Sequence, residues 1–226
     1  MKIYLSCYHK TGTHFFNDLK NILMKHDKEN EYINDIWSHN ANKITPNEKD
    51  VKIIHLIRHP YEIIMSGLFY HKKCNEEWCV NTNKNTKADN NNYNFQGLSY
   101  QDKLNTLNIE DGINFEMEGR SYNTIIDMYN SNFYDYHFCI NIKMEDLIIH
   151  FEETIAKIIT FINNDNLQKI DFSSLQINNS DNKIYVTNTQ KMIDRYEYFF
   201  TDKNYHSFNE IFSNINLKKY NYNFTQ

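Results

Sequence analysis

Residues 51–71 read VKIIHLIRHPYEIIMSGLFYH, and they contain the clearest strand and the clearest helix start of the chain. The run 51–57 is almost continuously aliphatic, which is typical of a strand that is buried on both faces, as in a parallel sheet. Pro60 suits the first turn of a helix, and apolar residues continue to about His71. A buried strand that leads directly into a helix indicates the α/β class.

The same order of elements repeats outward from this segment. Short apolar runs predict further strands at 3–7, 32–37 and about 137–142, and helical periodicity predicts helices at 13–26, 100–107, 109–129 and 151–162. We therefore expect an α/β three-layer sandwich, with a central, mainly parallel sheet flanked by helices. The segment MEDL at 144–147 is expected to form a turn after the last strand.

The length of 226 residues fits a single domain over residues 1–226. The Asn-rich stretch at about 81–94 has no apolar periodicity, and we interpret it as a loop insertion within that domain because the pattern resumes on both sides. The formal net charge of -5 argues against a generally basic, nucleic-acid-binding surface. Nothing in the sequence indicates an oligomeric state.

The sequence also bears on the compartment. No stretch is apolar and long enough to cross a bilayer, so no membrane association is expected. The chain enters a predicted strand at once, which leaves no room for a signal peptide. The four cysteines lack zinc-ligand spacing and are expected to be thiols in a reducing compartment. These features predict a cytoplasmic protein.

A polar turn, YHKTGT at 8–13, joins the first predicted strand to its helix. The start of a helix presents backbone N–H groups and a positive dipole end to an anion. Lys10 adds a charge, the hydroxyls of Thr11 and Thr13 add donors, and Gly12 lets the backbone approach a ligand closely. The lysine comes before the glycine, so the turn is not a Walker A loop.

The order K-T-G-T after a strand resembles the 5'-phosphosulfate-binding loop of sulfotransferases that use 3'-phosphoadenosine 5'-phosphosulfate (PAPS). The position after Thr13 often carries a second hydroxyl residue in that family, whereas this chain has His14. A backbone contact survives this change and a hydroxyl contact does not. The resemblance implies a P-loop nucleotide-binding-like fold and the following cofactor-binding residues: His9, Lys10, Thr11, Gly12, Thr13 and His14.

A second element of the same family is similar to residues 51–71. In that element an apolar strand ends in Arg-x-Pro, and a helical Ser follows eight residues after the Arg, as Arg58 and Ser66 do here. A guanidinium at a strand end can hold a phosphate with two hydrogen bonds. Both elements come at carboxyl ends of predicted parallel strands, where ligands of open α/β sheets collect. The resemblance therefore implies that Arg58 and Ser66 bind the 3'-phosphate.

The resemblance covers about residues 1–165. It includes SGLFYHKKCNEEW (66–78), YQDKLNTLNIEDGINFEM (100–117) and the strand before MEDL. Many family members carry a C-terminal K-G-x-x-G-D-W segment that closes over the 3'-phosphate. The corresponding region here, TNTQKMIDRYEYFFT (187–201), lacks both glycines and the tryptophan. Lys191 is the cofactor-binding residue we expect there, and Arg195 is another possible source of a cation.

The implied activity is transfer of a sulfuryl group from PAPS to a hydroxyl or amine of a glycan or small-molecule acceptor, with release of 3'-phosphoadenosine 5'-phosphate (PAP) and without a metal. Lys10 would stabilise charge on the leaving phosphate. His39 follows a predicted strand, as the family's catalytic histidine does, and is the expected base. His71, Glu76 and Glu77 remain alternative bases.

Two other functions stay open. A P-loop nucleotide phosphotransferase would need Gly-Lys-Ser/Thr and a strand-end Asp for Mg²⁺, and neither is evident. A catalytically silent PAP- or PAPS-binding protein is compatible with His14 and with the missing C-terminal glycines. His55 and His59 have metal-like spacing, but one lies inside a predicted strand and the other beside Arg58, so no metal site is expected.

Overall fold

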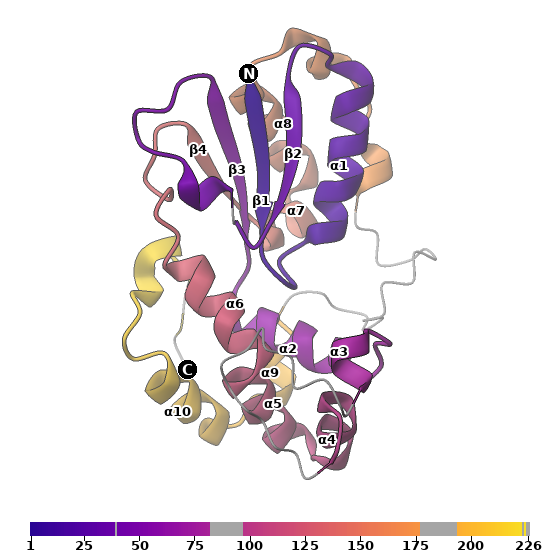
Figure 1. Ribbon diagram of the computed structural model, residues 1–226, viewed down its shortest axis with the longest axis vertical. Helices are drawn as coiled ribbons and strands as arrows, with labels where there is room; N and C mark the ends of the chain where they lie inside the picture. Colours follow the sequence, from indigo (N-terminus) through magenta and orange to yellow (C-terminus); the bar gives the residue numbers. More distant parts are fainter. Residues whose placement is uncertain (39, 82–96, 177–193, 223, 225–226) are drawn as a thin grey trace. The chain divides into compact units, whose positions relative to one another are not determined.

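The computed structural model describes residues 1–38, 40–81, 97–176, 194–222 and 224 (Figure 1). Within these residues, strands β1 (Lys2–Cys7), β2 (Glu31–Ile36), β3 (Val51–Ile57) and β4 (Cys139–Lys143) form one sheet in the order β2-β1-β3-β4. All neighbouring strands are parallel. The predicted α/β class with a central parallel sheet flanked by helices is thus confirmed.

The described helices are α1 (Thr13–His26), α2 (Pro60–His71), α3 (Glu77–Val80), α4 (Tyr100–Thr106), α5 (Ile109–Glu118), α6 (Arg120–Tyr129), α7 (Met144–Ile149), α8 (Phe151–Ile162), α9 (Tyr196–Phe199) and α10 (Asp202–Ile211). Single 3₁₀ turns occur at Ala41–Lys43, Asp165–Lys169, Ser173–Leu175 and Leu217–Tyr220. None of these helices is long and apolar enough to cross a membrane.

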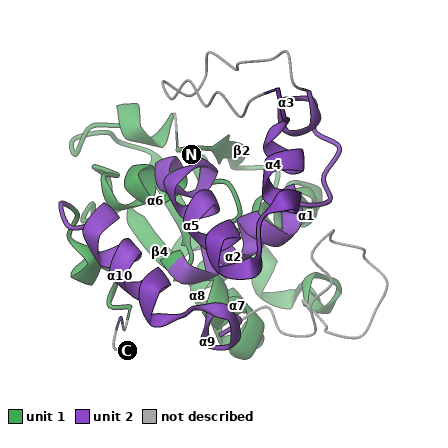
Figure 2. Ribbon diagram, turned by 90° about the horizontal axis from the view of Figure 1, so that it is seen from below, with its two compact units in different colours: residues 1–60, 124–180, 215–222 green, residues 61–123, 181–214, 223–226 purple. Residues whose placement is uncertain are grey.

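The chain forms two compact units (Figure 2). The first unit comprises residues 1–60, 124–180 and 215–222 and contains the sheet. The second comprises residues 61–123, 181–214 and 223–226, and its described elements are helical. The expectation of a single domain over 1–226 stays a prediction, and the Asn-rich stretch lies, apart from Asn81, outside the described residues.

The sheet of the first unit is covered on both faces, as the apolar pattern of β3 requires. On one face, Val51 and Ile53 pack in a cluster with Phe133 and Phe138. On the other face, the Lys52 Nζ atom donates to the last carbonyls of α8, at 2.7 and 3.0 Å from the Phe161 and Ile162 oxygens. Because successive side chains of β3 point to opposite faces, this strand contacts the layer on each side of the sheet.

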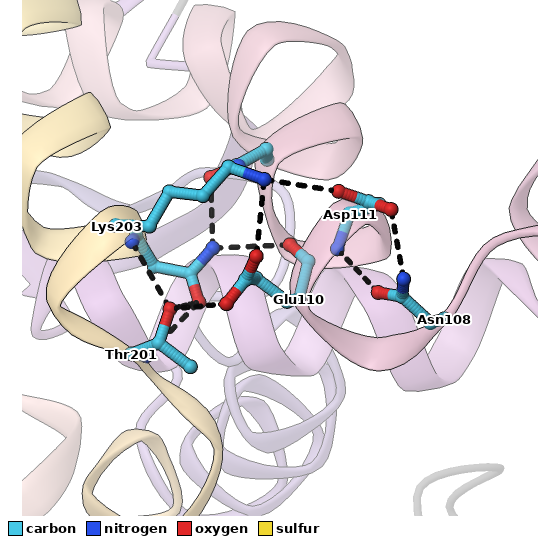
Figure 3. A network of polar contacts seen from close by, with 7 residues as sticks. Asn108, Glu110, Asp111, Thr201 and Lys203 are labelled. Carbon is cyan, nitrogen blue, oxygen red and sulfur yellow. Dashed lines mark hydrogen bonds and ion pairs between the residues drawn. The ribbon is translucent and has the colours of Figure 1, made fainter.

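The second unit has an aromatic core around Tyr61. Its ring lies 4.6–5.6 Å from the rings of Tyr196, Phe200, Tyr205, Phe208 and Phe224. The start of α10 is joined to α5 by a polar network in which the Thr201 hydroxyl donates to Glu110 at 2.7 Å, and Lys203 contacts Glu110 and Asp111 (Figure 3). Thr201 also caps α10 by accepting from the Asn204 N–H.

Two predictions about helices were wrong. The single helix expected at 109–129 is interrupted at Gly119, whose backbone is non-helical (φ -95°, ψ -119°). The Tyr100 hydroxyl occupies the space there, 2.7 Å from where a Cβ atom would lie. The turn expected at 144–147 is the first part of helix α7, because Met144 and Leu147 are buried at helical spacing.

Candidate nucleotide site

The loop between β1 and α1 is held in one shape by its own hydrogen bonds. The Thr11 hydroxyl accepts from the Tyr8 N–H at 2.7 Å and donates to the Tyr8 carbonyl at 3.0 Å. The Thr11 N–H donates to the same carbonyl at 3.2 Å. Thr11 is fully buried, so its hydroxyl shapes the loop. A part for Thr11 in binding stays a prediction.

Gly12 lies where the loop packs against its neighbours. Its φ of +121° belongs to a region that L side chains rarely adopt. A Cβ atom on Gly12 would lie 2.5 Å from Leu56 Cδ2 and 3.1 Å from Met144 Sδ. Lys10 also has a positive φ, 61°. At Gly12 the loop therefore lies so close to β3 and α7 that only glycine fits there without displacing its neighbours.

Helix α1 begins directly after Gly12. Its first intrahelical bond runs from the Phe16 N–H to the Gly12 carbonyl at 3.2 Å, and the first N–H groups of a helix point away from its own carbonyls. The first turn carries no acidic side chain, and no side chain caps it. A helix start of this kind favours an anion, and anion binding at this position stays a prediction.

Arg58 joins the two predicted anion-binding elements. It follows β3 directly, is 4% exposed, and its Nη1 atom donates to the Lys10 carbonyl at 3.0 Å. β1 and β3 are neighbours, and the chain runs from β1 to β2 on one side and to β3 on the other. Arg58 and the Lys10 loop thus meet at the point where the strand order reverses, the usual ligand position of an open α/β sheet.

Glu145, at the start of α7, contacts the turn that carries Arg58. It accepts from the His59 N–H at 2.9 Å and from the Tyr222 hydroxyl at 3.0 Å. Burial raises the pKa of Glu145, while the charge of Arg58 and these hydrogen bonds act in the opposite direction. From the sequence, Glu145 and Asp146 were expected to order a turn near the cofactor edge, whereas no local signal pointed to Tyr222.

The loop after β2 lies at the same sheet edge. Trp37 and Ser38 have positive φ angles of 67° and 50°. The Asp35 carboxylate accepts from the Asn40 N–H at 2.9 Å, and the Ser38 hydroxyl lies 2.5 Å from that of Ser6 on β1. His9 stacks on Trp37 with ring centroids 5.9 Å apart, so these two loops contact each other.

His39, the expected base, lies outside the described residues, and so does Lys191. The residues that flank His39 belong to the loop after β2 just described. Ser66 lies on α2, in the second unit, and is 6% exposed. Its part in phosphate binding stays a prediction.

The alternative bases have other contacts. His71 is fully buried, and its Nδ1 atom lies 2.8 Å from Glu116, which also accepts from Tyr100 and Ser121. Gly67 belongs to this arrangement, because a Cβ atom there would overlap Glu116 Oε1. His71 is thus part of a buried polar core rather than an accessible base.

The two glutamates near α3 also differ from each other. Glu76 accepts hydrogen bonds from the Tyr70 hydroxyl and the Trp78 indole N–H, whereas Glu77 is exposed. These contacts give Glu76 a role in holding α3, and they assign no chemistry to either carboxylate.

Arg195, the other candidate cation near the C-terminus, forms a buried ion pair in the second unit. Its backbone N–H and Nε atom donate to Glu62 at 2.6 and 2.9 Å, and the guanidinium is 4% exposed. The charge of Arg195 is therefore balanced by Glu62. No local signal in the sequence pointed to this pairing across 133 residues.

The histidines with metal-like spacing have separate roles. His55 is fully buried on β3, with its Nδ1 atom 2.7 Å from the Asn141 side-chain oxygen, and His59 packs edge-on against Tyr222. The described part of the chain contains no group of three His, Cys, Asp or Glu side chains that could hold a metal ion. All four cysteines are free thiols.

Comparison with known proteins agrees with the fold. No family model and no curated protein matches the sequence. Among solved structures, the chain is similar to the crystal structure of mouse sulfotransferase SULT7A1 complexed with PAP. The TM-score is 0.52 and the sequence identity 17%, and the alignment covers 94% of this chain and 83% of that one. The two proteins share a fold.

Proposed function

We propose that this chain is a PAPS-dependent sulfotransferase that transfers a sulfuryl group to a hydroxyl or amine of a glycan or small-molecule acceptor. The observation that carries the proposal is the hydrogen bond between Arg58 and the Lys10 carbonyl, which joins a buried cation to a glycine loop and a helix start. A nucleotide with a phosphate at each end of its ribose needs two such anion sites side by side. The similar solved structure, in which mouse SULT7A1 holds PAP, supports the same choice of nucleotide.

Each residue of the proposed site would have a separate role that follows from its chemistry. The N–H groups at the start of α1 and the Lys10 ammonium would hold the 5'-phosphate and stabilise charge that develops on it. The Arg58 guanidinium would hold the 3'-phosphate. Bound PAPS supplies the sulfuryl group. His39 is proposed to take the proton of the acceptor, which a neutral imidazole can do.

Calorimetric titration of PAP, without added metal, tests the proposal. We expect PAP to bind and ATP to bind much more weakly. Arg58→Met should weaken PAP binding roughly 10- to 100-fold, the range for losing hydrogen bonds to a charged group. Lys49→Met is the matched control, because it removes one positive charge from an exposed position just before β3, at the opposite end of that strand from Arg58.

The result also separates the proposal from its competitors. Absence of PAP binding, or tighter binding of ATP with Mg²⁺, would contradict it and favour the phosphotransferase. Tight PAP binding without transfer from radiolabelled PAPS to any member of a broad panel of glycans, alcohols, amines and tyrosyl peptides would favour the silent binding protein.

A further inference from the structure

The turn that carries Arg58 is held from outside by Glu145. One carboxylate oxygen accepts from the His59 backbone N–H at 2.9 Å, and the other accepts from the Tyr222 hydroxyl at 3.0 Å. His59 is the residue next to Arg58, so the first of these bonds fixes the backbone from which the guanidinium extends. The Glu145 side chain thus connects the end of β3 to the C-terminal segment.

Tyr222 contacts this turn in more than one way. Its ring packs edge-on against the His59 ring, with centroids 5.0 Å apart. The Lys143 Nζ atom lies 4.5 Å from the centre of the Tyr222 ring and 3.2 Å from the Asn221 carbonyl. Tyr222 is therefore placed by contacts with the turn after β3, with the end of β4 and with the start of α7.

The segment 217–222 that carries Tyr222 is itself anchored. Lys219 Nζ donates to the carbonyls of Tyr129 and Ser131 at 2.6 and 2.9 Å. The Tyr220 hydroxyl donates to the Met128 carbonyl at 2.7 Å, and Tyr220 is 3% exposed. All these residues belong to the first unit. The hydroxyl of Tyr222 is thus presented to Glu145 by a fixed piece of chain.

A carboxylate beside Arg58 has a cost for the proposed site, because it competes with a phosphate for the same cation. Glu145 accepts hydrogen bonds from the His59 N–H and the Tyr222 hydroxyl. Through these bonds it orders the turn and keeps Arg58 in place before the nucleotide binds. A side chain with the rotamer freedom of arginine gains most from such ordering.

We propose that Glu145 and Tyr222 are positioning residues for the 3'-phosphate, so that the C-terminal segment 217–222 forms part of the nucleotide site. This inference rests on the proposed function and extends it to Glu145 and to Tyr222, which no sequence motif marks.

The experiment compares the affinity for PAP with that for adenosine 5'-phosphate, which lacks the 3'-phosphate. The ratio of the two reports the 3'-phosphate site alone, since general loss of structure lowers both affinities. We expect Glu145→Ala to reduce the wild-type preference for PAP about tenfold, and Tyr222→Phe about threefold, within the range for single hydrogen bonds. Glu145→Gln should keep the preference at or above the wild-type value, because an amide can accept from His59 and carries no competing charge.

Tyr220→Phe is the matched control, because it removes a buried hydroxyl from the same segment without touching Glu145. It should leave the preference unchanged even if the protein is less stable. The inference is overturned if Glu145→Ala and Tyr222→Phe keep the full preference while Arg58→Met abolishes it, or if Glu145→Gln loses as much as Glu145→Ala. An increased preference in Glu145→Ala would make Glu145 a competitor of the phosphate and would also overturn it. If the wild type itself shows no preference for PAP, the proposed function fails first.

Discussion

Replacing Gly12 with alanine should destabilise the first unit through two separate effects. The φ of +121° is unfavourable for an L side chain by about 1–2 kcal/mol. In addition, the new Cβ atom would lie 2.5 Å from Leu56 Cδ2 and 3.1 Å from Met144 Sδ, and such overpacking costs about 1–3 kcal/mol. We therefore expect a loss of about 2–5 kcal/mol, a large fraction of the stability of a typical domain.

The chain offers a control that separates the two effects. Gly97 also has a positive φ, +86°, but a Cβ atom there would meet nothing within 4 Å. Gly97→Ala should therefore show the backbone cost alone, about 1–2 kcal/mol. Equilibrium urea unfolding, followed by circular dichroism, measures both losses.

A double-mutant cycle then tests the contact directly. Leu56→Ala removes the atom nearest to the new Cβ, so the pair Gly12→Ala and Leu56→Ala should be less destabilised than the sum of the single variants, by about 1 kcal/mol or more. The reasoning is refuted if Gly12→Ala costs no more than Gly97→Ala, or if the two losses simply add.

Two further predictions concern histidines. Burial lowers the pKa of His55 to about 4, and Lys219 acts in the same direction, so the unfolded chain binds a proton at a higher pH than the folded one. The free energy of unfolding should therefore fall by roughly 3 kcal/mol in all as the pH drops from about 6.5 to 4. Urea unfolding at several pH values measures this dependence, which His55→Gln should lose. His39→Ala should keep its affinity for PAP and lose about 10²- to 10⁴-fold in turnover. His71→Asn disturbs the buried Glu116 network, so it should lose roughly 1–3 kcal/mol of stability and keep its turnover per folded molecule. The reverse pattern would exchange the roles of the two histidines.

Local patterns predicted the elements of this fold well where one chemical reason governs a short segment. The strand at 51–57 and the helix that starts at Pro60 have the predicted bounds, because a β-branched run and a proline restrict the backbone by themselves. The break at Gly119 could not be read in the same way. There the Tyr100 hydroxyl, which the fold brings from another helix, accepts from the Arg120 N–H at 3.4 Å and leaves no room for a Cβ atom on Gly119.

The candidate site shows the same division. The glycine loop and Arg58 were found from the sequence because each lies directly after a strand, and the ends of parallel strands share one edge of a sheet. Glu145 was expected only to order a turn near the cofactor edge, and its partner Tyr222 was missed, since their contact joins segments 77 residues apart. The Glu62 and Arg195 pair was missed for the same reason.

The order of strands explains why the two motifs meet. Had β3 paired beyond β2 instead of next to β1, the same sequence motifs would end at the same edge but too far apart for Arg58 to reach the Lys10 carbonyl. Their pairing is long-range and parallel, and the apolar run of β3, which demands burial on both faces, favours a central position for it. The buried strand therefore does more than complete the core, because its central place in the sheet puts the guanidinium beside the helix start that would bind the other end of the nucleotide.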